Sequence, residues 1–414
     1  MSGGVYGGDE VGAIVVDPGS YTIRLGYAGE DSPKFDIPSC IGKSLDPETQ
    51  ETKYRIDTVN LAAPRKGCEV SNMMKDGMVE DWDAFENLLD YAYDKCIKSE
   101  SQYHPVLCSE AAWNARGKRE KICELFFEKY QVPAFFLVKS AVLSAFANGR
   151  FSGVVVDSGA SHTSAVPVID GYVLQHAIIK SPLGGDFLIN QSVNFLKDRN
   201  IDLACPYMIA DKKVVRDGDK PKWTRKPNLP EVTQSWHNYQ EKQVVRDFAH
   251  SVLSCSEVAY DIDTALSMPA EPYEFPTGYS EEFGCDRYQI AESLFDPSFI
   301  KGCTSTMLGM SHVVASSISL CDIDLRPSLY SGVVVTGGNS LTSGFVERLT
   351  RDLNARTPPN MRLKVLSAQG ATERRFGSWI GGSILGSLGS FQQMWISRQE
   401  YDEAGKSQVD RKCP

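Results

Sequence analysis

The chain has 414 residues, of which 42% are hydrophobic, and its formal net charge is −10. This length suffices for two or three hydrophobic cores, and the ordinary composition excludes a disordered or fibrous protein. The negative charge argues against a protein whose whole surface clamps a polyanion, and the 11 cysteines include no C-x-x-C pair, which disfavours a zinc site or a disulfide framework.

The N-terminal part of the chain predicts a strand, a tight turn and a second strand. Its first ten residues lack the basic and apolar segments of a signal peptide, and no later apolar run is long enough to cross a bilayer. "GAIVVDPGSYTIR" (12–24) runs through an apolar strand to Asp17, turns, and resumes as a strand with alternating apolar residues. Residues 39–76 are polar and acidic, so we expect a small, mobile insertion of marginal structure there.

Three helices are predicted between residues 82 and 150. Apolar residues recur at helical spacing in 82–97 and in 119–130. A further helix is expected at 141–150, and it should end at Gly149 in a left-handed cap.

The second half repeats the opening pattern and adds a third glycine turn. "GVVVDSGASHT" (153–163) is again an apolar strand that ends at an aspartate before a glycine turn, and a turn at Asp170-Gly171 completes its hairpin. Residues 195–243 have no clear period and predict a long surface excursion. A buried strand, a Gly-Gly turn and an amphipathic helix follow at 331–349, and 379–395 predicts a glycine-studded helix. The duplication indicates an α/β protein in which two similar domains face a cleft.

Two stretches are locally basic although the whole chain is acidic. They are "ARGKREK" at 115–121 and "DKPKWTRK" at 219–226. We interpret both as solvated faces, because short runs of charge usually are.

The chemistry of the glycine turns predicts a nucleotide site. Glycine at a hairpin tip lets backbone N–H groups converge on an anion, and a hydroxyl beside it, from Ser20 or Ser158, adds a donor. Asp17 and Asp157 would lie behind the phosphates, where a divalent cation and its waters belong. The turn at Gly337-Gly338 opens onto a helix and supplies a surface for the nucleoside or an anion.

Other site chemistries find no support in the sequence. It contains no P-loop and no G-x-S-x-G elbow, and its six histidines show no metal-ligand spacing. His162 follows the second turn directly, and we interpret it as a hairpin side chain with a satisfied hydrogen bond rather than as a catalytic base.

The three turns, in this order, resemble the two phosphate loops and the adenosine loop of the actin–sugar kinase–heat-shock ATPase superfamily. The resemblance to actin is closer still and extends from about residue 12 to residue 414. Segments that carry it are "LGYAGEDSPKFDIPS" (25–39), "VVVDSGASHTSAVPVIDGY" (154–172) and "TGGNSLTSGFVERL" (336–349). It implies the actin fold, an α/β architecture of two similar RNase H-like domains, or four subdomains, around a nucleotide cleft.

The resemblance also implies where the subdomains begin and end. Subdomain 1 would comprise 1–38, 73–147 and 378–414, and subdomain 2, the divergent polymerisation-loop region, would comprise 39–72. Subdomain 3 would comprise 148–183 with 303–377, and subdomain 4 would comprise 184–302, including an insertion at 205–240 that actin lacks at this length.

That insertion, the opening "MSGGVYGGDEVGA" and the ending "DRKCP" resemble the nuclear actin-related proteins of class four. These are actin-like subunits of chromatin-remodelling and histone acetyltransferase complexes. Membership would imply transcription regulation in the nucleus. It would also imply nuclear actin, a helical segment of the remodelling ATPase and other subunits of the complex as partners, near the nucleosome and away from membranes.

The resemblance implies ATP with Mg²⁺ or Ca²⁺ as the ligand. Asp17 and Asp157 would hold the cation through water. The residues expected to bind the nucleotide are Asp17, Gly19, Ser20, Tyr21, Arg24, Asp157, Ser158, Gly159, Ser161, Arg246, Gly337, Gly338, Asn339 and Arg375.

Departures from the actin pattern predict that no residue is catalytic. Ser140 stands where actin has the glutamine that positions its hydrolytic water, and Ser164 replaces a histidine that helps to polarise it. Arg24 replaces the phosphate-binding lysine but keeps its charge. The other replacements that erode the site are Pro18, Tyr21, Ala160, Ala249 and His250. The alternatives are a slow ATPase or sugar-kinase-like phosphotransferase, or a cytoskeletal actin, which the altered 42–76 segment disfavours.

In the actin fold an apolar cleft receives partner helices. It would be bordered here by helices at 141–149 and 383–394 and by the turn at Gly171-Tyr172, with Gly386 and Gly389 allowing close approach. The alternative is that its residues only pack the hinge between the halves. The expected lining residues are Phe146, Tyr172, Leu385, Leu388 and Met394.

Overall fold

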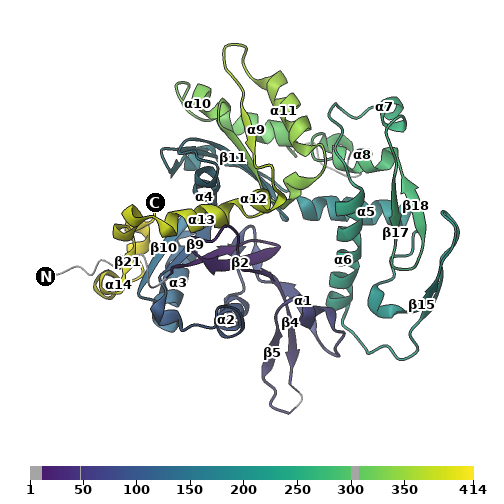
Figure 1. Ribbon diagram of the computed structural model, residues 1–414, viewed down its shortest axis with the longest axis horizontal. Coiled ribbons are helices and arrows are strands. Elements are labelled where there is room, and N and C mark those ends of the chain that lie inside the picture. Colours follow the sequence, from purple (N-terminus) through teal and green to yellow (C-terminus); the bar gives the residue numbers. More distant parts are fainter. Residues whose placement is uncertain (1–11, 47, 300–306) are drawn as a thin grey trace.

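In the computed structural model, which describes residues 12–46, 48–299 and 307–414, two sheets of the same design form the two halves of the molecule (Figure 1). In the first, β1 pairs antiparallel with β2 and parallel with β9, which is parallel to β10. In the second, β11 pairs antiparallel with β12 and parallel with β19, which is parallel to β20. The duplication inferred from the sequence is therefore a duplication of sheet topology.

We call each sheet with its helices a lobe. The first sheet has the order β21 (Ile396–Ser397), β10 (Ala134–Lys139), β9 (Val106–Glu110), β1 (Ile14–Pro18), β2 (Thr22–Tyr27) and β3 (Phe35–Pro38). The second has the order β13 (Tyr172–Val173), β12 (Thr163–Ile169), β11 (Gly153–Ser158), β19 (Val333–Thr336) and β20 (Val365–Ser367), with β14 (Ile179–Ser181) paired to β12.

Helices pack around these sheets, and the longer ones among them bury an apolar stripe. Those of the first lobe are α2 (Trp82–Tyr91), α3 (Arg116–Glu124), α4 (Ser140–Ala147), α13 (Gly377–Ser387), α14 (Arg398–Ala404) and α15 (Gln408–Lys412). Those of the second are α5 (Gly185–Asp198), α6 (Gln234–Val252), α7 (Ile262–Leu266), α8 (Cys285–Glu292), α9 (Met310–Ser319), α10 (Arg326–Tyr330), α11 (Phe345–Arg356) and α12 (Ala371–Arg375). Two hairpins complete the fold: β7 (Met74–Lys75) with β8 (Met78–Val79), and β17 (Glu271–Glu274) with β18 (Ser280–Phe283).

Each lobe has its own hydrophobic core. Ile14, Val15 and Val16 of β1 are buried in the first core, and the valines of β11 and β19 are buried in the second lobe. Within the first lobe α13 crosses α4, and Gly381 allows this crossing because a Cβ there would collide with the carbonyl of Leu143. Among the described residues, no helix combines the length and the apolarity that a bilayer span needs.

The predicted helices are confirmed, with one difference in their last turns. The helix expected at 82–97 is α2 followed by a π-helical segment, Ala92–Ile97, and the one expected at 119–130 is α3 followed by Leu125–Lys129, also π-helical. Gly149 has φ +66°, as its predicted left-handed cap requires.

Two segments contain more regular structure than expected: residues 39–76, predicted as a mobile insertion of marginal structure, and residues 195–243, predicted as a surface excursion without a clear period. Residues 39–72 contain a three-stranded sheet, β5-β4-β6, and a helix, listed by bounds as β4 (Cys40–Leu45), β5 (Thr52–Arg55), α1 (Thr58–Ala62) and β6 (Glu69–Asn72). Residues 195–243 contain the end of α5, a hairpin of β15 (Ile209–Lys213) with β16 (Lys222–Arg225), and the start of α6. These strands carry charged side chains on their exposed faces, so they lack the apolar alternation that reveals a strand.

The C-terminal glycine-studded helix is shorter than predicted. α13 ends at Ser387, Leu388 is extended, and Gly389–Gln393 form a 3₁₀ turn. Gly386 does not face a partner, because it is buried and a Cβ there would lie 3.1 Å from the Cβ of Ala28. Gly389, by contrast, has open space at its Cβ position.

Candidate functional site

A cavity of about 670 Å³ lies between the two lobes. Its volume is in the range of small-molecule and cofactor sites. The β1–β2 turn, the β11–β12 turn, the turn after β19 and one side of α6 all contribute to its wall. The cavity-lining residues among those expected to bind the nucleotide are Asp17, Gly19, Ser20, Tyr21, Arg24, Asp157, Gly159, Ser161, Arg246, Gly337, Gly338, Asn339 and Arg375.

The hairpin tips that reach this cavity are closed by equivalent hydrogen bonds. Gly19 N–H donates to the Thr22 carbonyl at 3.0 Å, and Gly159 N–H donates to the His162 carbonyl at 3.0 Å. The third turn requires glycine, because Gly337 has φ +93°. The sequence therefore sets all three turns locally.

Ser158 does not occupy the position expected of a phosphate donor. Its side chain is fully buried, and its hydroxyl contacts Thr163 Oγ1 at 2.7 Å and accepts a hydrogen bond from Asn339 Nδ2 at 2.9 Å. A residue at the end of β11 alternates away from the cavity when its neighbour Asp157 faces it. Ser158 thus joins the second turn to the third, and Ser161 is the hydroxyl of this turn that lines the cavity.

The two strand-end aspartates differ in their surroundings. Asp17 is 3% exposed, and both of its carboxylate oxygens have protein partners: Arg24 Nη1 at 2.9 Å and the hydroxyl of Ser109. The carboxylate of Asp157 lines the cavity without a hydrogen-bond or ion-pair partner in the described part of the chain. Asp157 is therefore the carboxylate that remains available to a ligand.

The electrostatics of Asp157 suit a cation. Burial raises the pKa of its carboxyl from 3.8 to about 6, the positive charge of Arg24 opposes this rise, and the negative charge of Asp17 adds to it. A divalent cation held through water would relieve the charge of an unpaired carboxylate. In the described residues no group of three or more His, Cys, Asp or Glu side chains is arranged to hold a metal directly. The geometry thus fits a cation that keeps most of its own waters or takes phosphate oxygens as ligands.

Replacing Asp157 with Asn tests this assignment through pH and cation dependence. A carboxyl whose pKa is raised by folding stabilises the protein below pH 4, and this contribution is lost as the pH rises through about 6. At pH 7.5 and without ligand, D157N should therefore be more stable than the natural chain, by up to about 3 kcal/mol. Thermal melts between pH 4.5 and 7.5 should show a fall for the natural chain that is absent in D157N.

The second half of the test uses the ligand. Adding Mg-ATP should raise the melting temperature of the natural chain more than that of D157N. D157E keeps the charge and serves as the control, and its increment should stay above that of D157N. Equal increments for the natural chain and D157N would show that the carboxylate does not meet the cation.

The arginines that line the cavity are already paired with carboxylates. Arg246 lies 3.4 Å from Asp186, and its guanidinium stacks 4.1 Å from the ring centroid of Tyr21. Arg375 lies 2.5 Å from an oxygen of Asp36. A bound polyphosphate would therefore share these two arginines with Asp186 and Asp36. The departures from the actin pattern likewise indicated an eroded nucleotide site.

The two hairpin tips contact each other directly. Ser161 Oγ donates to Ser20 Oγ at 2.9 Å, although 141 residues separate them in the chain. Together with the stacking of Arg246 on Tyr21, this contact joins the lobes across the cavity. The sequence gives no signal of this contact, because the backbone hydrogen bond that closes each turn is formed within that turn.

The positions that departed from actin also face the cavity. Ser140, the first residue of α4, lines it, and so does Ser164, which lies directly opposite Asp157 in the β11–β12 register. His162 accepts or donates a hydrogen bond with Ser161 Oγ at 2.8 Å and contacts Trp113 edge-on, and its pKa is lowered by burial. His162 is thus a satisfied hairpin side chain, as predicted.

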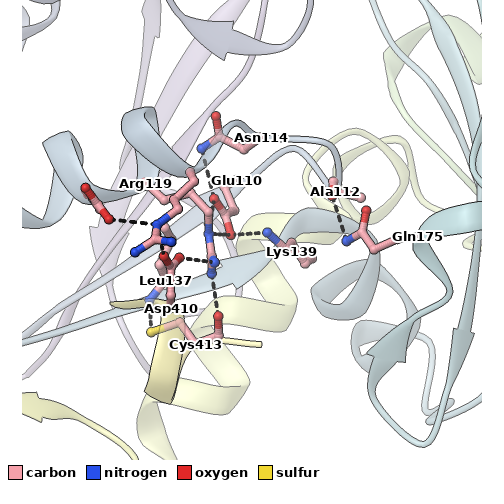
Figure 2. A network of polar contacts seen from close by, with 11 residues as sticks. Glu110, Ala112, Asn114, Arg119, Leu137, Lys139, Gln175, Asp410 and Cys413 are labelled. Carbon is pink, nitrogen blue, oxygen red and sulfur yellow. Dashed lines mark hydrogen bonds and ion pairs between the residues drawn. The ribbon is translucent and has the colours of Figure 1, made fainter. Parts of the chain in front are cut away.

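A buried charge network behind the cavity was missed by the sequence analysis (Figure 2). Glu110, at the end of β9, lines the cavity and pairs with Lys139 at 2.5 Å and with Arg119 at 2.9 Å. Arg119 also pairs with Asp410 of α15 at 2.8 Å, so the C-terminal helix is tied to the rear of the site. The sequence signal for this network was a charged residue, Glu110 or Lys139, at the end of each of two apolar strands.

A second group that the sequence analysis missed joins the lobes beside α6. Residues 58–70 of the small sheet unit contact residues 233–240 at the start of α6, and we call these contacts the lobe clamp. Trp236 Nε1 and Gln240 Nε2 donate to the Leu61 carbonyl at 2.8 and 2.9 Å. The indole of Trp236 is fully buried. Figure 1 shows α1 and β4 beside the lower end of α6.

The residues expected to receive a partner helix remain largely on the surface. Tyr172 is 62% exposed, Met394 46% and Leu388 38%, whereas Phe146 and Leu385 are half-buried. Phe146 packs edge-on against Phe151, which is itself exposed. We call Phe146, Tyr172, Leu385, Leu388 and Met394 the apolar face.

Comparisons with known proteins agree with the fold. The profile of the actin family matches residues 8–414. The chain is 38% identical to "Actin-related protein 4" of Arabidopsis thaliana, covering 99% of this chain and 100% of that protein. It is 38% identical to "Actin-related protein 4" of Yarrowia lipolytica, covering 97% and 95%. It is 36% identical to "SWI/SNF and RSC complexes subunit arp42" of Schizosaccharomyces pombe, covering 98% and 100%.

Proposed function

Since this chain belongs to the actin family, we propose that it is a structural, non-hydrolysing subunit of a nuclear chromatin-remodelling or histone acetyltransferase complex. In that role it binds actin and a helical segment of the remodelling ATPase. The main support is likeness over the whole chain to relatives such as arp42, whose name places that protein in SWI/SNF and RSC complexes. The four-subdomain division given above belongs to the same proposal.

The proposal includes ATP with Mg²⁺ or Ca²⁺ in the cavity between the lobes. The unpartnered carboxylate of Asp157 and the two glycine turns support it. Bound ATP would supply a polyphosphate that both lobes contact. A ligand that binds only the folded state stabilises it by RT ln(1 + [L]/Kd), on the order of a few kcal/mol at high occupancy. Extraction of the purified chain with acid, followed by chromatography, should recover the nucleotide as ATP.

The absence of hydrolysis has its own test. The serine side chains of Ser140 and Ser164 are short, and neither carries the amide or imidazole that the resemblance assigns to the hydrolytic water. We expect the purified natural chain to release phosphate from ATP at the buffer background. The S140Q/S164H variant restores an amide that can orient the water and an imidazole that can accept its proton. General-base assistance by an imidazole contributes about 10²-fold or more, so phosphate release by this variant should exceed background.

One result would decide against the non-hydrolysing reading. Robust phosphate release by the natural chain would contradict it and would favour an ATPase. S140Q without the second change supplies the matched comparison, and it should release less phosphate than the double variant.

A further inference from the structure

The hairpin within the insertion forms a separate arm of the molecule. We call residues 209–226, which comprise β15, β16 and the loop between them, the basic arm. In Figure 1 it lies at the right-hand edge, on the opposite side from the C-terminus. Hydrogen bonds hold it in place: Gly218 N–H donates to the Ser280 carbonyl at 2.8 Å, and Lys226 N–H donates to the Met208 carbonyl at 2.9 Å. The arm is thus a fixed part of the fold.

The charge of the arm is opposite to that of the chain. It carries seven cationic side chains and three carboxylates, on a protein of net charge −10. At physiological ionic strength charges act over about 8 Å, so a ligand at the arm meets the arm's own field. The cationic residues are Lys212, Lys213, Arg216, Lys220, Lys222, Arg225 and Lys226.

Most of this charge has no protein partner. Lys212 pairs with Glu274 at 2.6 Å, and within the described ranges the six other cations form no ion pair. All six are exposed. Lys213 lies directly opposite Lys222 in the β15–β16 register, and like charges in opposed positions destabilise a hairpin. An anion at the arm would relieve that repulsion.

The side-chain composition of the basic arm favours one class of polyanionic partner over the others. Protein–protein interfaces are depleted in lysine and enriched in aromatic and apolar anchors. In the basic arm, Val214 is the one exposed large apolar side chain, so the arm does not have the composition of such an interface. Trp223 is half-buried and its Nε1 donates to Asp202 at 3.1 Å, so it does not offer the open ring face on which single-stranded bases stack. Flexible lysines act as point charges toward phosphate and read no base sequence.

We propose that the basic arm binds the phosphate backbone of duplex DNA without sequence preference. This goes beyond the proposed function, because it neither needs the nucleotide nor uses the apolar face. The stretch 219–226, interpreted from the sequence as a solvated face, would then be part of a binding surface.

The test measures binding of the purified full chain to a fluorescein-labelled 30-base-pair duplex of random sequence by anisotropy, between 50 and 200 mM KCl. The variant K213E/K220E/K222E should bind at least about tenfold more weakly at 50 mM KCl. Each lost phosphate contact lowers the slope of log K against log salt by about 0.9, so the slope should fall by nearly 3. The milder K213Q/K220Q/K222Q should show an intermediate loss.

A matched control separates the arm from net charge. K75E/K98E/K364E changes the charge equally at exposed lysines on other faces, and its affinity should stay within about threefold of the natural chain's. Thermal melts confirm that each variant is folded.

Two outcomes would overturn the proposal. One is equal loss of duplex binding in the arm variant and the control. The other is binding of poly-L-glutamate by the natural chain as tightly as of the duplex, which would assign the arm to an acidic protein surface instead.

Discussion

Leu388→Asp is expected to abolish co-purification of actin and of the remodelling ATPase, while the chain itself still folds. Leu388 is 38% exposed and extended directly after α13, so a carboxylate there stays hydrated in the free chain. Within an apolar docking surface the same carboxylate would lose water without gaining a partner, which costs several kcal/mol, as much as the loss of a binding hot spot.

The measurement is an affinity purification of the tagged chain from its own cells, with partners identified by mass spectrometry. Ile323→Asp is the matched control, because Ile323 is 67% exposed between α9 and α10 and lies outside the apolar face. It should retain both partners. If L388D melts normally and still assembles, the apolar face is not the docking surface, and the insertion at 205–240 becomes the next candidate.

Trp236→Ala should open the lobe clamp and release bound nucleotide on the order of 100-fold faster. The indole is fully buried, Tyr207 packs edge-on against it at 4.8 Å, and its Nε1 bonds to the Leu61 carbonyl at 2.8 Å. Removing a buried tryptophan typically costs 3–5 kcal/mol. Since this side chain bridges the two lobes, much of that cost should appear as a lower free energy of cleft opening.

Further hydrogen bonds of the lobe clamp allow its opening to be measured in the absence of nucleotide. Val70 N–H donates to Ser235 Oγ at 3.0 Å, and Thr233 Oγ1 donates to the Cys68 carbonyl at 2.5 Å. Hydrogen exchange should therefore show at least about tenfold faster exchange across 61–72 in W236A. Dissociation of a fluorescent ATP analogue gives the release rate.

A second tryptophan supplies the control for this experiment. Trp223 lies in the same insertion, is half-buried and bonds to Asp202, but it takes no part in the clamp. W223A should leave both the exchange at 61–72 and the nucleotide release unchanged. An unchanged release rate in W236A, together with faster exchange at 61–72, would show that the clamp does not gate the cavity.

Much of the fold was predictable because its signals are local. A strand of valines and isoleucines, an aspartate and a glycine turn determine a hairpin within a dozen residues, and this pattern occurs twice. The strands within 39–76 and 195–243 were not predicted, because they pair through charged and polar residues whose order follows no period. Their structure comes from pairing between strands and from packing on α6.

The sequence by itself determined the three turns, the duplicated sheet and the family, because glycine conformations and apolar strands depend on neighbouring residues. Only the tertiary structure decided how the site's charges are divided. In the folded protein Asp17 pairs with Arg24, whereas Asp157 has no partner among the described residues. The side chain of Ser158 is turned away from the cavity, and Ser20 contacts Ser161. The contacts of Ser161 with Ser20 and of Asn339 with Ser158 join residues 141 and 181 positions apart. The first of them depends on how the two separately folded lobes close on each other.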